Sequence, residues 1–111
     1  MSKPKIYLSG PISGYDLEER KAAFLEARKI LERKGYEVFN PMENGLPAEA
    51  TTHQHMRRDL SELTREDMPY DAIYLMERWN HSAGCMTELH VATAIGLQVY
   101  TEFRGDIVRI M

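Results

Sequence analysis

The sequence predicts a single α/β domain in which helices cover both faces of a mainly parallel sheet. Three observations support this prediction. The chain has 111 residues, which suits one domain built around one hydrophobic core. Short apolar segments alternate with longer segments of helical periodicity, as in β-α-β units. The sequence contains no repeat, low-complexity tract or linker, so residues 1–111 are treated as one domain.

The first part of the chain predicts a strand, a helix and a second strand. Residues 5–9 are short and apolar and stop at a Gly-Pro pair, which indicates a buried strand. Residues 17–34 carry apolar side chains at helical spacing, with Asp16 as a candidate N-cap and Gly35 as the stop. Residues 36–39 form the second expected strand.

Residues 41–51 are rich in Pro, Asn and Gly and predict a loop of a length that is often functional. The remaining elements follow from the same patterns. They are a helix over 53–65 with Met56, Leu60 and Leu63 inward, a strand over 71–76, a loop over 77–84, a helix over 85–95, a strand over 97–101 and a fifth strand over 106–111. Together these elements predict a flavodoxin- or Rossmann-like three-layer sandwich with four or five strands.

Composition and charge narrow the classes of partner. The net charge is −3, from 17 acidic and 14 basic side chains, and this disfavours a nucleic-acid polymer while leaving a small ligand open. Cys85 is the only cysteine, which fits a reducing compartment. No apolar run resembles a signal peptide or a membrane span. We therefore expect a cytoplasmic protein that does not interact with membranes.

The carboxyl ends of parallel strands predict where a ligand would bind. The segment Ser9-Gly10-Pro11-Ile12-Ser13-Gly14 follows the first strand, and its glycines and backbone amides could accommodate a phosphate or a ribose. It matches neither a GxGxxG fingerprint nor a P-loop. The alternative is that Gly10-Pro11 only makes a turn.

A second candidate segment precedes the last helix. Trp79 offers a flat face on which a base could stack, although a lone Trp more commonly packs over a sheet edge. Ser82 or Asn80 could cap the helix, and Gly84 closes the segment. We expect Arg78 and His81 to be solvated.

Two carboxylates remain as candidate reactive groups. Glu88 lies near the start of a largely apolar helix, where it could act chemically or only stabilise the helix dipole. Asp59 could face the ligand or pair with a basic group one helical turn away. We expect no metal, because the spacing of His53 and His55 suits opposite helix faces and Cys85 has no second Cys nearby. Cys85 itself suits a small buried residue better than a nucleophile.

The ordered set of segments resembles the nucleoside 2-deoxyribosyltransferase superfamily, including its nucleoside 5′-monophosphate N-glycosidases. The resemblance spans residues 5–96 and is strongest to an uncharacterised bacterial and phage branch. It rests on Ile6-Tyr7-Leu8-Ser9-Gly10-Pro11-Ile12-Ser13-Gly14, Gly35-Tyr36-Glu37-Val38-Phe39-Asn40-Pro41, Met56-Arg57-Arg58-Asp59-Leu60, Asp71-Ala72-Ile73-Tyr74-Leu75, and Trp79-Asn80-His81-Ser82-Ala83-Gly84 with Glu88.

The resemblance implies chemistry at an N-glycosidic bond without a cofactor. Glu88 matches the nucleophile that attacks C1′, and Tyr7 matches the hydroxyl that orients it. Asp59 matches a carboxyl that handles the proton at the base. Ser82 matches the position that holds the 5′ side of the sugar, where a Ser instead of an Asp favours a 5′-monophosphate. The nucleophile has to be ionised, and the helix start with Tyr7 is expected to keep it so.

The chain departs from the superfamily pattern in two places. Ser13 occupies the position of an Arg that contacts phosphate in the hydrolases, which leaves a phosphate to backbone amides, Arg57 or Arg78. Members are typically homodimers or larger and often complete the pocket with a C-terminal segment of a neighbouring subunit, for which only residues 103–111 are available. Two alternatives therefore stay open, a nucleotide-binding or sensing module without turnover and a fold kept for assembly.

Overall fold

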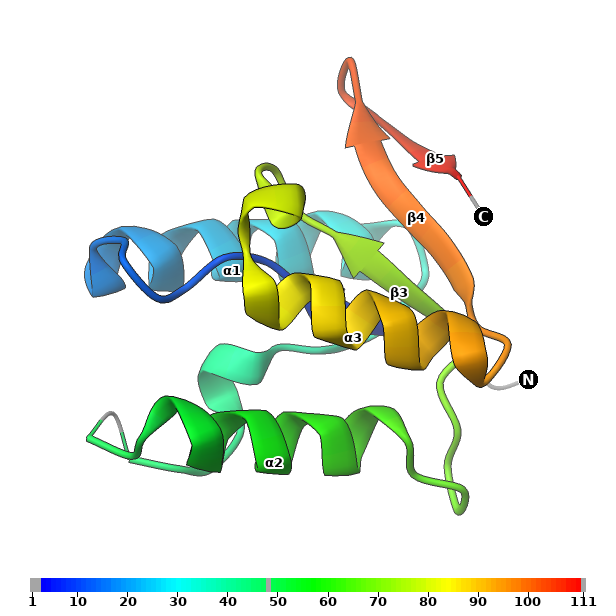
Figure 1. Cartoon of the computed structure of the whole chain (residues 1–111). Helices are drawn as coiled ribbons and strands as arrows, with labels where there is room; N and C mark the ends of the chain where they lie inside the picture. Colours follow the sequence, from blue (N-terminus) through cyan, green and yellow to red (C-terminus); the bar gives the residue numbers. More distant parts are fainter. Residues whose placement is uncertain (1–2, 48, 111) are drawn as a thin grey trace.

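A computed structural model describes residues 3–47 and 49–110 and shows a five-stranded sheet in the order β2-β1-β3-β4-β5 (Figure 1). The strands are β1 (Lys5–Ser9), β2 (Glu37–Phe39), β3 (Ala72–Leu75), β4 (Gln98–Phe103) and β5 (Asp106–Arg109). The first four are parallel, and β5 returns antiparallel beside β4. The predicted α/β class with a mainly parallel sheet is confirmed.

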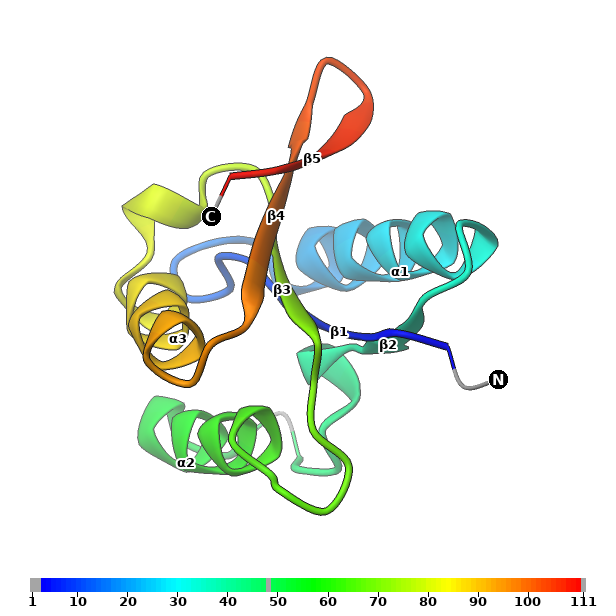
Figure 2. The same ribbon diagram turned by 90° about the vertical axis from the view of Figure 1, so that its right-hand side faces the viewer.

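Three helices form the outer layers of the sandwich. Helix α1 (Leu17–Arg33) covers one face of the sheet, while α2 (Thr52–Leu63) and α3 (Ala83–Ala94) cover the other (Figure 2). The pleat of β1 divides its side chains between the two layers, as the period of two in a strand requires. Ile6 and Leu8 pack with α1, whereas Tyr7 belongs to the core under α2 and α3.

Side-chain caps explain where the helices begin. The predicted cap Asp16 accepts from the backbone N–H of Glu19 at 2.9 Å and starts α1. Thr51 and Gln54 form a reciprocal capping box at the start of α2. Of the two candidates for α3, Ser82 is the cap, because its hydroxyl accepts from the N–H of Cys85 at 3.2 Å.

The structure corrects several predicted boundaries. Helix α3 begins at Ala83 rather than Cys85, because the Ser82 cap recruits Ala83 and Gly84 into its first turn. The predicted loop over 77–84 therefore ends sooner and contains a 3₁₀ turn, η2 (Trp79–His81). The loop over 41–51 likewise starts with a 3₁₀ turn, η1 (Pro41–Glu43), which has a proline at its start.

The fifth strand is confirmed over a shorter range than the predicted 106–111, and Met111 lies outside the described residues. It pairs with β4 as a hairpin that projects beyond the helices (Figure 1). Across residues 3–47 and 49–110, the structure contains no helix long and apolar enough to cross a membrane.

Candidate active site

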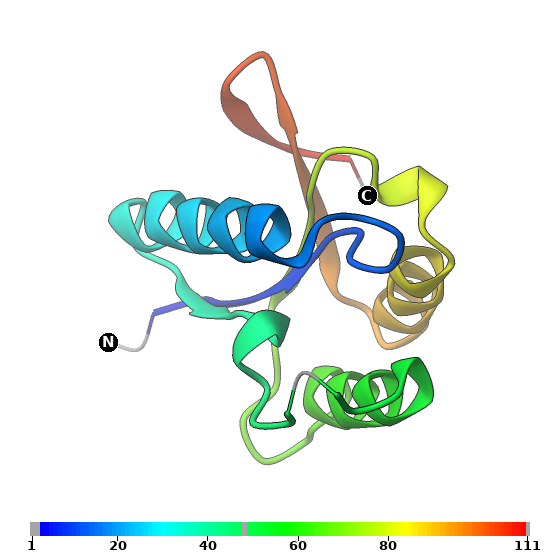
Figure 3. The same ribbon diagram turned by 90° about the vertical axis from the view of Figure 1, so that its left-hand side faces the viewer.

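The edge of the sheet where the parallel strands end collects the segments that the sequence singled out (Figure 3). The β1–α1 connection, η2 and the first turns of α3 all reach this edge. The backbone links two of these segments directly, because the N–H of Met76, just after β3, donates to the carbonyl of Ser9 at the end of β1. The topology therefore brings the predicted loops together.

Glu88 is a buried carboxylate held by two hydroxyl groups from β1. The Tyr7 hydroxyl donates to Oε2 at 2.5 Å, and the Ser9 hydroxyl donates to Oε1 at 2.7 Å. Glu88 is only 6% exposed, and both donors are fully buried. Each oxygen of the carboxylate thus has one charge-assisted hydrogen bond, which fixes the orientation of the group between β1 and α3.

The pleat of β1 and its neighbours place both hydroxyls on this face of the sheet. Tyr7 and Ser9 are two residues apart on one strand, so their side chains point the same way. The Tyr7 ring stacks on Phe39 at a centroid distance of 5.3 Å and meets Tyr70 edge-on at 5.9 Å. These aromatic contacts hold the phenol in one position.

Burial sets the electrostatics of the Glu88 carboxylate. The pKa of Glu88 is raised to about 7, mainly by burial, with hydrogen bonds from Ser9 and Tyr7 lowering it and the charge of Asp59 also raising it. The pKa of Tyr7 is raised by burial and by the charge of Glu88, so the phenol remains a donor. Of the two groups expected to keep Glu88 ionised, the Tyr7 hydroxyl does favour the ionised form, whereas the helix start does not account for it, because Glu88 lies beyond the first turn of α3.

Asp59 provides a second buried carboxyl group, from α2. It is 7% exposed, and the side-chain amide of Asn44 donates to its Oδ1 at 2.9 Å. Burial raises the pKa of Asp59, partly offset by the Asn44 hydrogen bond and by the charges of His55 and Arg58. The alternative of an ion pair along the helix is not found among the described residues, since Nδ1 of His55, one helical turn before Asp59, lies 3.1 Å from Nδ2 of Asn44 instead.

The first loop differs from the expected row of accessible glycines and amides. Gly10 and Pro11 are buried, Ile12 is half-buried, and only Ser13 and Gly14 are exposed. A side chain on Gly10 would lie 2.8 Å from Sδ of Met76 and 3.1 Å from Cζ of Phe24. Packing inside the protein therefore accounts for Gly10.

In residues 78–81, just before α3, one side chain packs against the core and the others face solvent. Trp79 is half-buried against the core beneath α2 and α3, and Asn80 and His81 are exposed. Arg78 is exposed as expected, and its guanidinium lies 4.8 Å from the centroid of the Tyr15 ring, which links this segment to the first loop.

Gly84 sits where α2 and α3 meet. A Cβ atom on Gly84 would lie 3.2 Å from Cε of Met56, so the missing side chain lets the two helices approach closely. Gly84 thereby brings the helix that carries Asp59 close to the helix that carries Glu88.

The single cysteine and the histidines do not form a metal centre. Cys85 is buried, and burial raises the pKa of its thiol, which opposes nucleophilic reactivity. His53 is exposed, and Nδ1 of the half-buried His55 lies 3.1 Å from Nδ2 of Asn44. In residues 3–47 and 49–110 no cluster of three His, Cys, Asp or Glu side chains could hold a metal ion.

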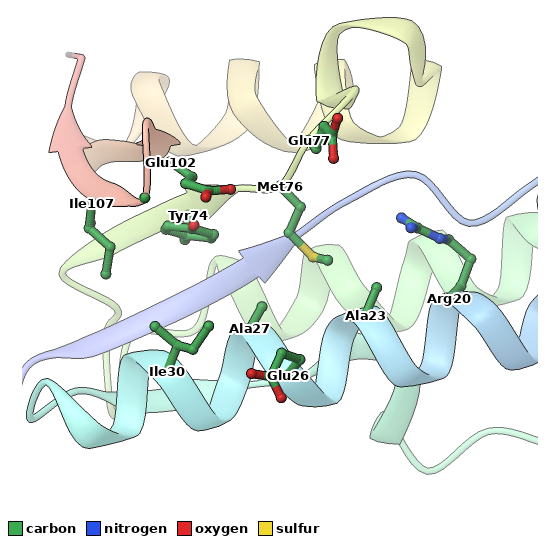
Figure 4. Close-up of a pocket in the computed structure, with 11 residues that line it drawn as sticks. Arg20, Ala23, Glu26, Ala27, Ile30, Tyr74, Met76, Glu77, Glu102 and Ile107 are labelled. Atoms are coloured by element: carbon green, nitrogen blue, oxygen red, sulfur yellow. The ribbon is translucent and has the colours of Figure 1, made fainter.

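A groove of about 280 Å³ lies on the opposite face of the sheet, between α1 and the β4–β5 hairpin (Figure 4). Ala23, Ala27 and Ile30 of α1 form one wall, and Tyr74 and Met76 contribute from the sheet side. None of the residues predicted for the site lines it. The groove exists because a single helix leaves the β4 and β5 side of this face uncovered.

Two features of the site were not anticipated from the sequence. Ser9 was expected to contact substrate, but its hydroxyl donates to Glu88 instead. Its spacing of two from Tyr7 on one strand could have indicated this role. Asn44 was only part of a predicted loop, and nothing in its local sequence points to Asp59, which is 15 residues away.

Comparison with known proteins places the chain in a family without assigning an activity. No curated protein matches the sequence. Residues 4–101 match the family described as Domain of unknown function (DUF4406), and this range includes every element of the site described above. Since the match extends over most of the 111 residues, the chain belongs to this family.

Proposed function

We propose that the protein cleaves the N-glycosidic bond of a nucleoside or nucleoside 5′-monophosphate, or transfers its sugar, through a covalent glycosyl-Glu88 intermediate. The observation that carries this proposal is the Glu88 carboxylate, buried and held by Tyr7 and Ser9 beside a second buried carboxyl, Asp59. A carboxylate that only stabilised the helix dipole would not need to be buried and held by two hydroxyl donors. The resemblance to the nucleoside 2-deoxyribosyltransferase superfamily supports the same assignment.

The first chemical step uses both carboxyl groups. An oxygen of ionised Glu88 forms a bond to C1′ of the sugar, and the bond between C1′ and the base nitrogen breaks with its electron pair on the base. Asp59 gives its proton to the departing base. The first half of a retaining glycosidase reaction has the same arrangement.

The second step releases the sugar from Glu88. A water molecule attacks C1′, Asp59 takes a proton from it, and the C1′–oxygen bond to Glu88 breaks. If a second base attacks through a ring nitrogen instead, Asp59 takes the proton of that nitrogen, the C1′–oxygen bond to Glu88 breaks, and the product is a new nucleoside. In both cases the hydroxyls of Tyr7 and Ser9 stabilise the carboxylate as it leaves.

The mechanism needs a single proton on the two buried carboxyl groups. Glu88 must be ionised while Asp59 is protonated, so the pair has to hold one proton. Burial raises the pKa of each carboxyl, to about 7 for Glu88, and their mutual repulsion disfavours the doubly charged state. We therefore expect a bell-shaped pH dependence of base release.

A panel of nucleosides and their 5′-monophosphates tests the proposal, with released base measured by chromatography. Glu88→Ala should abolish release while its circular dichroism spectrum stays that of the wild type. Mass spectrometry of acid-quenched wild-type protein should show the mass of the sugar added to the chain. Release that survives Glu88→Ala would exclude the mechanism. A second free base in the mixture separates transfer, which yields a new nucleoside, from hydrolysis.

The main competing interpretation is a module that binds a nucleotide without turnover. Ser13, at the position of a phosphate-binding Arg in related hydrolases, weakens the hydrolase assignment and so leaves this interpretation open. A thermal shift with one nucleotide, without release of base from any member of the panel, would support that interpretation. The resemblance also implies a homodimer or larger assembly, which light scattering of the purified protein would test.

A further inference from the structure

The side-chain amide of Asn44 connects the loop after β2 to Asp59 and His55 of α2. Its Nδ2 donates to Oδ1 of Asp59 at 2.9 Å and lies 3.1 Å from Nδ1 of His55. Its Oδ1 accepts from the backbone N–H of Leu46 at 3.0 Å. Asn44 is 5% exposed, so both amide hydrogens and the carbonyl oxygen are engaged inside the protein.

The hydrogen bond from Asn44 makes the two oxygens of Asp59 unequal. Oδ1 accepts the amide hydrogen, while Oδ2 has no hydrogen-bond partner among the described residues. Oδ2 is not sealed from solvent either, since Nε of Arg28 is the one fully buried side-chain N or O atom without a hydrogen bond in the described part of the chain. A proton on Asp59 therefore belongs on Oδ2, the oxygen that is free to meet another molecule.

The neutral amide suits a carboxyl group that has to hold a proton. A guanidinium or ammonium partner would strongly favour the ionised form of Asp59, whereas an amide donor fixes one oxygen and favours ionisation much less. Burial still outweighs the Asn44 hydrogen bond, so the pKa of Asp59 stays above its ordinary value.

His55 fixes the amide of Asn44 in turn. Nδ2 of Asn44 can only donate, so Nδ1 of a neutral His55 ring is the acceptor in this contact. The position of the amide is thus set from both sides, by His55 and by the N–H of Leu46.

We propose that Asn44 is the positioning residue for Asp59, holding Oδ1 so that Oδ2 carries the proton given to the leaving base. This inference rests on the proposed function. Asn44 acts through Asp59 and touches no reacting atom, so its effect should depend on how much the leaving base needs a proton.

The test compares two substrates, one whose base must be protonated as it leaves and one whose base leaves without a proton. An N7-methylated purine leaves as a neutral base without taking up a proton, whereas the ordinary purine needs one. For a pyrimidine substrate, the 5-fluorouracil counterpart departs more readily as an anion. The variants are Asn44→Ala, which removes the amide, and Asn44→Asp, which keeps an acceptor for Leu46 and loses the donor.

Asn40→Ala is the matched control. Asn40 is another buried asparagine of the same segment, but its Oδ1 accepts from the N–H of Met42 at 3.0 Å and its amide donates to Glu43. It shares the loop with Asn44 without contacting Asp59. Circular dichroism and thermal unfolding show which variants are folded before any rate is compared.

We expect both Asn44 variants to lower the single-turnover rate of base release, which reports the first step alone, about tenfold or more for the ordinary base, since general acid catalysis contributes about 10²–10⁴-fold. For the activated base the loss should be about threefold or less, as for Asp59→Asn. Equal losses on both bases, or the same pattern for Asn40→Ala, would overturn the inference.

The outcomes also separate this inference from the proposed function. If Asp59→Asn shows the leaving-base dependence and folded Asn44→Asp behaves as the wild type, only the role of Asn44 is refuted. If the wild type releases no base from either substrate, the proposed function fails and the role of Asn44 fails with it.

Discussion

Replacing Glu88 by Gln should make the protein more stable at alkaline pH. Glutamine keeps the size of the side chain but cannot ionise. In the wild type, burial raises the pKa of Glu88 from its ordinary 4.5 to about 7. The folded protein therefore binds this proton more tightly than the unfolded chain does, and ionising the carboxylate weakens the fold.

The size of the effect follows from the two pKa values. They differ by about 2.5, and one unit of pKa corresponds to about 1.36 kcal/mol, which gives roughly 3 kcal/mol for the full titration. The contribution of the protonated group to stability is fully present below pH 4.5 and is lost as the pH rises through 7. The stability of Glu88→Gln relative to the wild type should rise by roughly this amount between pH 4 and pH 9.

Urea unfolding at a series of pH values, followed by circular dichroism, measures the difference between wild type and variant. Glu62→Gln is the control, because Glu62 also accepts from a tyrosine hydroxyl, that of Tyr70, at 2.5 Å. Burial raises the pKa of Glu62, but hydrogen bonds from Tyr70 and Arg65 lower it by more, so the pKa lies below its ordinary value. This control should therefore lose relative stability as the pH rises. A constant difference between Glu88→Gln and the wild type would refute the reasoning.

Three further changes test other parts of the structure. Tyr7→Phe removes one donor to Glu88, so the acid limb of base release should move to higher pH by about one unit, given the strength of hydrogen bonds to charged groups; an unmoved limb would contradict the pairing. Gly10→Ala should cost about 1–3 kcal/mol in urea unfolding, because the new methyl group meets Met76 and Phe24. Thr51→Ala should cost about 1 kcal/mol by loss of the capping box, and an unchanged midpoint would argue against that box.

The order and type of the helices and strands follow from local patterns in the sequence. The apolar run of β1, the helical periodicity of α1 and the cap at Asp16 are each encoded within a few neighbouring residues. The starting point of α3 was misplaced because Ala83 and Gly84 carry no periodic signal of their own, and the Ser82 cap decides their conformation.

The candidate site was predicted less completely, since its geometry depends on contacts between distant segments. Glu88 and Tyr7 were paired through the resemblance, and they are 81 residues apart in sequence. The burial of Glu88, which raises its pKa, follows from the packing of α3 on β1 and cannot be read from the helix position alone. Asn44 was missed for the same reason, because its partners on α2 come from the fold.

The contact between Gly84 and Met56 makes the spacing of the two carboxyl groups adjustable. Asp59 moves with α2 and Glu88 moves with α3, and the missing side chain at Gly84 brings these helices together. A bulkier residue at position 84 is expected to push α2 and α3 apart and so to separate Asp59 from Glu88 without altering either side chain. If the proposed mechanism holds, the size of the residue at this crossing should change which bases are accepted, so position 84 is a single place at which to test that range.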